Sequence, residues 1–61
     1  GRDGQQGMAS LQLAELAFIQ GRNGDVRIYA DRAINGLKPG SPAWQRANDV
    51  KQAAERKKEE E

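Results

Sequence analysis

Glu15 and Asp31 are the first candidates for a pair of carboxylates that could catalyse hydrolysis. Hydrolysis by paired acids requires two carboxyl groups held at a fixed distance beside a cleft. At helical spacing, Glu15 and Asp31 fall on the outer faces of two separate predicted helices. We therefore interpret both as solvated surface charges and predict no catalytic residues.

The residue types that bind metals and nucleotides are also missing. The chain contains no cysteine and no histidine, so a zinc site would have to use carboxylates alone. Segment 21–25, GRNGD, resembles neither a Walker loop nor a dinucleotide fingerprint, and its glycines suit a turn. We predict that the chain binds no metal and no cofactor.

The composition limits the class of partner. The 61 residues allow one domain at most, and 10 basic against 9 acidic residues leave a net charge of +1. This balance provides no general attraction to nucleic acid or to an anionic membrane. No apolar run approaches the roughly 20 residues that cross a bilayer, so no membrane insertion is expected.

The elements that must position any functional side chain are two amphipathic helices joined by a short link. They are predicted over residues 8–20 and 25–37, and the short link makes them antiparallel neighbours. Gly21 suits the left-handed residue that ends a helix, and Asn23 or Asp25 is expected to cap the next one.

Apolar residues cover more than half of the circumference of the first helix. We therefore expect this helix to pack against neighbours on more than one side. Its main face is predicted to hold Leu11, Leu13, Ala14, Ala17 and Phe18. Leu16 widens this face, whereas Ile19 points almost the opposite way. Ile28 falls on the charged side of the second helix. We predict Leu16, Ile19 and Ile28 as contacts for a protein partner.

Alanines on the facing stripes of the two helices predict a close approach of their axes. Larger side chains then fill the volume around the seam. The predicted structural anchors are Leu13, Phe18, Tyr29, Leu37 and Trp44.

A third helix should follow the hairpin. Segment 38–40, Lys-Pro-Gly, ends the second helix, and Ser41 followed by Pro42 starts the third, with serine as the N-cap. The inner face of this helix is mostly alanine, so Trp44 is expected to anchor it by packing over the open end of the hairpin.

The predicted fold is therefore all-α, a helical hairpin plus a capping helix over residues 8–54. The glycine-rich residues 1–7 are predicted to be a flexible lead-in. Residues 55–61 are predicted to be a charged tail that frays, because its glutamates oppose the helix dipole.

A hairpin of this kind followed by a further helix resembles the tetratricopeptide repeat, which has about 34 residues. The positions that match its pattern are Leu13-Ala14, Gly21 and Ala33-Ile34. The chain departs from the pattern at Ser10, which replaces its early tryptophan, and at Val26, which replaces an alanine of the second helix.

Segment 40–50, GSPAWQRANDV, resembles the end of the C-terminal tetratricopeptide region of cell-envelope zinc metalloproteases. This resemblance implies a helical domain of the periplasm or cell envelope that recruits or orients client proteins beside a separate catalytic domain. The protease motif His-Glu-x-x-His requires histidine, so the resemblance implies a non-catalytic piece. The expected partners are preceding repeats, a client polypeptide or a second copy of the chain.

Three short helices with glycine turns also describe helix-turn-helix domains. The basic residues that would meet phosphates are Arg22, Arg27, Arg32 and Arg46. Acidic residues alternate with these arginines, however. A protein that binds duplex DNA usually has a continuous basic face. A small three-helix nucleic-acid-binding domain is therefore the alternative hypothesis.

Overall fold

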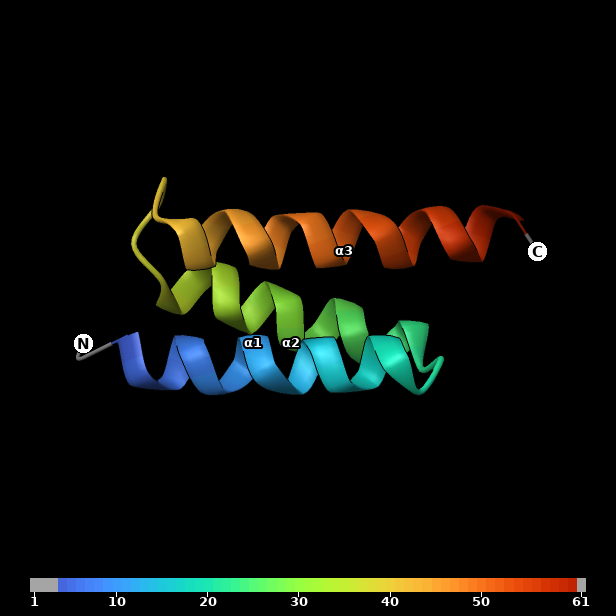
Figure 1. Cartoon of the computed structure of the whole chain (residues 1–61), viewed down its shortest axis with the longest axis horizontal. Coiled ribbons are helices and arrows are strands. Elements are labelled where there is room, and N and C mark those ends of the chain that lie inside the picture. The colour runs from blue at the N-terminus through green and yellow to red at the C-terminus, as the bar shows by residue number, and fades with distance from the viewer. Residues whose placement is uncertain (1–3, 61) are drawn as a thin grey trace.

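The computed structural model of the chain describes residues 4–60, with side chains up to residue 56. Within that range it contains three helices and no strand: α1 (Gly4–Ile19), α2 (Asn23–Gly36) and α3 (Pro42–Glu60) (Figure 1). The first two form an antiparallel hairpin, and α3 runs back in the direction of α1 (Figure 1). The prediction of an all-α fold is confirmed.

Small residues build most of the core. Both α1 and α3 pack against α2, and they also contact each other. The buried apolar residues are Leu11, Ala14, Ala17, Val26, Ala30, Ala33, Leu37, Ala47, Val50 and Ala54. Six of these ten are alanine, and Val26 is the largest residue that is fully buried. Short side chains at the contacts let helix axes approach closely, as the sequence predicts.

The first helix begins one turn earlier than predicted, at Gly4. Gly7 lies in this extra turn and is buried against α2. A Cβ atom added to Gly7 would lie 2.8 Å from Cγ of Leu37 and 2.9 Å from the carbonyl carbon of Gly36. The prediction of a flexible lead-in is thus wrong for residues 4–7, because the glycine serves close packing there. Residues 1–3 lie outside the described range.

Glycine shapes the turn between α1 and α2. Gly21 has a φ of +81°, as a residue that ends a helix in the left-handed conformation should. Its amide donates to the carbonyl of Phe18 (3.1 Å), and the amide of Arg22 donates to the carbonyl of Ala17 (2.9 Å). These two bonds satisfy carbonyl groups at the end of α1.

The predicted cap of α2 is wrong. Arg22 occupies the N-cap position, and no side chain forms a capping hydrogen bond there. Asn23 already lies inside the helix, and its buried Oδ1 has no hydrogen-bond partner among the described residues. Asp25 lies in the first turn, where its negative charge favours the positive end of the helix dipole.

The start of α3 agrees with the sequence prediction. The amide of Ser41 donates to the carbonyl of Lys38 (3.0 Å) across a turn in which Gly40 has a φ of +88°. The Oγ of Ser41 then accepts a hydrogen bond from the amide of Trp44 (3.2 Å). Ser41 is therefore the N-cap, and Pro42 is the first helical residue.

Replacing Ser41 with alanine should lower the free energy of unfolding by about 1 kcal/mol, because an amide of the first turn loses its acceptor. Urea unfolding followed by circular dichroism measures this loss. The Ser41→Asp variant retains an acceptor and should remain close to the parent. An equal loss in both variants would contradict a capping role.

The last helix continues to Glu60, beyond the predicted end of the helical unit at residue 54. The residues from Glu55 onward are glutamate, arginine and lysine, all of which have high helix propensity. This propensity favours continuation of the helix, whereas the glutamates at the negative end of the dipole oppose it. The predicted tail is therefore helical over residues 55–60, while its fraying stays a prediction, and residue 61 lies outside the described range.

Candidate protein-contact surface

The large apolar side chains that remain exposed gather mainly on one side of α1. Met8 is 42% exposed and Leu13 44%, while Leu16 is 50% and Ile19 80% exposed. Exposed polar or small residues lie between them, and none is charged. We call this surface the outer α1 face, and it consists of Gln5, Met8, Ala9, Gln12, Leu13, Leu16 and Ile19.

The outward direction of this face follows from what α1 buries. Leu11, Ala14 and Ala17 belong to the clusters that α1 forms with α2 and α3. Leu11 and Leu13 are two positions apart, which corresponds to roughly 200° around a helix. Burial of Leu11 thus turns Leu13 outward, so the prediction of Leu13 as a structural anchor is wrong. Leu13 joins Leu16 on the exposed surface instead.

The other predicted anchors lie in or against the core. Leu37 is buried, whereas Phe18 and Tyr29 are half-buried and pack against the cluster that contains Val26. Trp44 is half-buried and packs against the second cluster, which contains Leu37. The tryptophan therefore lies where the end of the hairpin meets α3.

Of the three predicted contact residues, the structure groups only two. Leu16 and Ile19 share the outer α1 face, three positions apart on one helix. Ile28 is 54% exposed, but it lies on the side of α2 opposite its buried residues Val26, Ala30 and Ala33. The two isoleucines therefore point outward from different helices and do not form one patch.

A small groove of about 280 Å³ separates α1 from α3 along one edge of the outer α1 face. Its lining residues are Glu15, Phe18, Ile19, Arg46, Asp49, Val50 and Ala53. Nε of Arg46 donates to Oε2 of Glu15 over 2.6 Å and ties the two helices together. This hydrogen bond and the charge of Glu15 raise the pKa of Arg46, with a smaller contribution from Asp49. Glu15 is thus engaged in an ion pair between helices.

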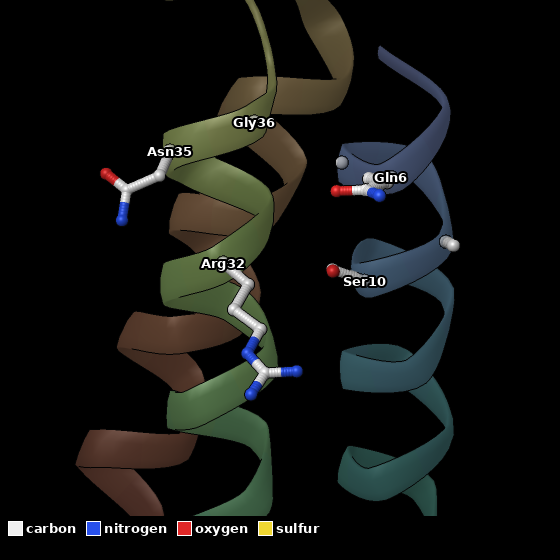
Figure 2. A pocket seen from close by; sticks show the side chains of 7 residues that line it. Gln6, Ser10, Arg32, Asn35 and Gly36 are labelled. Atoms are coloured by element: carbon white, nitrogen blue, oxygen red, sulfur yellow. The ribbon is translucent and has the colours of Figure 1, made fainter. Parts of the chain in front are cut away.

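A second hollow, of about 630 Å³, lies between the first turns of α1 and the last turns of α2 (Figure 2). It is lined by Gln6, Gly7, Ala9, Ser10, Arg32, Asn35 and Gly36. We call it the α1–α2 hollow. The sequence did not predict this hollow, because residues 4–7 were not expected to be helical. The one available indication was the spacing of Gln6 and Ser10, which share a helix face if the helix starts early.

Ion pairs on the remaining surface occupy most of the arginines that the nucleic-acid hypothesis would need. Arg22 lies 3.8 Å from Asp25, and Nε of Arg27 lies 3.6 Å from Glu55 of α3. Arg46 is paired with Glu15 as described above. Acidic side chains therefore interrupt the basic ones within the described part of the chain, and no continuous basic face results.

Asp31 also pairs with a cation, since Nζ of Lys51 lies 2.6 Å from its Oδ1. The two acids considered for hydrolysis thus form separate ion pairs with α3. Among the described side chains, which extend to residue 56, no group of three potential ligands could hold a metal ion. No helix of that part is both long and apolar enough to span a membrane.

The main surface features of the described residues are thus the uncharged outer α1 face, the groove between α1 and α3, and the α1–α2 hollow. Comparison with protein-family models, with curated proteins and with solved structures finds no match to the chain.

Proposed function

We propose that the chain is a non-catalytic protein–protein interaction module that packs its outer α1 face against an apolar helix. In the isolated chain, a second copy occupies this face. The observation that carries the proposal is the exposure of Leu13, Leu16 and Ile19 on a helix face without a charged residue. Contiguous exposed apolar surface of this kind typically marks an interaction site.

Charge supports a second copy as the occupant. In a two-fold symmetric dimer the same surface meets itself, so any charge at its centre meets a like charge. The outer α1 face avoids this repulsion because it is uncharged. The exposed sides of α2 and α3, by contrast, include Arg27, Asp31, Arg46 and Asp49. Of the three helices, α1 thus offers the surface best suited to self-pairing.

The resemblance of segment 40–50 supports a more specific form of this proposal. The chain is then the terminal repeat of a tetratricopeptide region in a zinc metalloprotease, and the outer α1 face packs against a helix of the preceding repeat. Neighbouring repeats in such arrays bury each other's apolar faces, and the last repeat needs a cap with a polar outer side. The charged exterior of α3 fits the role of that cap.

Replacing Leu16 and Ile19 together with glutamine should weaken self-association by about tenfold or more, since each substitution counts twice in a symmetric dimer. Sedimentation equilibrium over a concentration series measures the dissociation constant. Both residues are at least half exposed, so the melting temperature of the monomer should change little.

Ile28→Gln is the matched control, because it removes an equally large exposed side chain from a different helix. This variant should associate like the parent. A parent chain that stays monomeric at about 1 mM, a concentration that detects even weak dimers, would overturn the proposal. So would an equal effect of the Ile28 substitution.

A further inference from the structure

Polar side chains from two helices converge on the α1–α2 hollow. Figure 2 shows the guanidinium of Arg32 reaching from α2 into the gap between the helices. The Ser10 hydroxyl and the carbonyl oxygen of the Gln6 amide are turned toward the same gap from α1, whereas Asn35 points away from it (Figure 2). The hollow thus presents a guanidinium, a hydroxyl and an amide to any group that enters it.

Close approach of two glycines forms the end of this hollow. A Cβ added to Gly36 would lie 3.2 Å from Cα of Gly7, so the two backbones are nearly in contact. Neither residue projects a side chain into the space, which the lining residues leave with about 630 Å³. The volume is sufficient for a small polar group and part of the chain that carries it.

No lining residue compensates the positive charge of the hollow. None of its lining residues is acidic. Arg22, Arg27 and Arg46 each have a carboxylate within 4.0 Å, but no ion pair of Arg32 exists among the described residues. Arg32 therefore holds a positive charge beside neutral polar groups and without a counter-charge among the described residues.

We propose that the α1–α2 hollow binds a carboxylate of a protein chain, either a C-terminal carboxylate or an acidic side chain. The planar fork of Arg32 matches two carboxylate oxygens, and the Ser10 hydroxyl supplies a further donor. One cation balances the single charge of a carboxylate, whereas a phosphate group carries about −1.5 to −2 at neutral pH. The charge of the hollow thus favours carboxylate over phosphate.

This site does not depend on the outer α1 face being an interface, because a small carboxylate can be tested alone. Nitrogen-15 NMR of the full chain should be recorded during titration with N-acetylalanine, which carries a C-terminal-type carboxylate. N-acetylglutamate α-amide tests the side-chain form, and N-acetylalanine amide is the neutral control. Sodium chloride and inorganic phosphate at matched ionic strength test for plain charge screening and for phosphate preference.

Saturable shifts are expected at Arg32 Nε and at the amides of Ser10 and Gly36 with at least one acid probe, with a dissociation constant of about 10 mM or lower. The stronger of the two acid probes identifies the source of the carboxylate. Arg32→Gln should weaken this binding by about tenfold or more. Arg56→Gln, which removes an exposed arginine of α3 outside the hollow, should leave it unchanged.

Shifts that do not saturate, that chloride reproduces, or that survive in Arg32→Gln would overturn the proposal. Stronger binding of phosphate than of either acid would also overturn it. If Arg32→Gln fails to fold, Arg32→Lys provides the test, since it retains the charge but not the planar fork. Equal binding by the lysine variant and the parent would show that the fork is not required and would contradict the assignment.

Discussion

Replacing Trp44 with alanine is expected to lower the free energy of unfolding by about 3 kcal/mol or more, which is enough to unfold so small a domain. The indole packs against the cluster of Leu11, Ala33, Leu37 and Ala47, where α3 meets the hairpin. The fully buried residues of α3 near it are small, so no other side chain replaces this contact. Thermal melting followed by far-ultraviolet circular dichroism measures the loss.

Trp44→Phe is the matched control, because phenylalanine retains an aromatic ring at the same place. It should lose much less stability than the alanine variant. Both substitutions preserve the amide of residue 44 that donates to Ser41. An unchanged melting temperature in Trp44→Ala would contradict the anchoring role. Strong quenching of the parent's single tryptophan by iodide would contradict it as well, since it would show an indole open to solvent.

Replacing Gly7 with alanine should destabilise the chain by about 2 kcal/mol, the typical cost of overpacking. The new Cβ would lie 2.9 Å from the Gly36 carbonyl carbon and 3.0 Å from its oxygen, and backbone atoms cannot move aside without shifting a helix. Gly7→Val should destabilise further, because it adds two methyl groups at the same contact. Urea unfolding of the parent and both variants provides the comparison.

Gly24→Ala is the control for this experiment, since a Cβ atom at Gly24 would meet no atom within 4 Å. Gly24 lies within α2, where alanine should stabilise by about 0.5 kcal/mol through the lower entropy of the unfolded chain. Gly7→Ala should therefore be less stable than the parent, whereas Gly24→Ala should be more stable. A stabilised Gly7→Ala would show that the backbones of α1 and α2 are not in contact.

The Gly7–Gly36 contact also bears on both proposed surfaces. It holds the first turns of α1 against the last turns of α2, and these turns line the α1–α2 hollow. The same packing fixes the rotation of α1 and so exposes Leu13 and Leu16. A variant that loosens this contact should therefore weaken carboxylate binding and self-association together. For this reason the binding tests use substitutions at exposed residues only.

Local sequence determined helix boundaries wherever the boundary depends on one residue and its neighbours within a single helical turn. Gly21 ends α1 with positive φ, and Ser41 caps α3 with its own hydroxyl. Each of these effects depends on backbone geometry and hydrogen bonds that span at most five residues. The all-α fold class follows from the same local patterns.

Only the tertiary structure decided which side of α1 faces solvent. A helix with apolar residues around most of its circumference has no single preferred direction of burial. Its rotation is set by the partner surfaces, and here the close fit of Gly7 and the alanines turns Leu13 outward. The pairing of Glu15 with Arg46, 31 positions apart, and the open charge of Arg32 likewise depend on how the helices meet. Sequence periodicity thus determined which segments are helices, whereas packing between helices determined which residues are available to a partner.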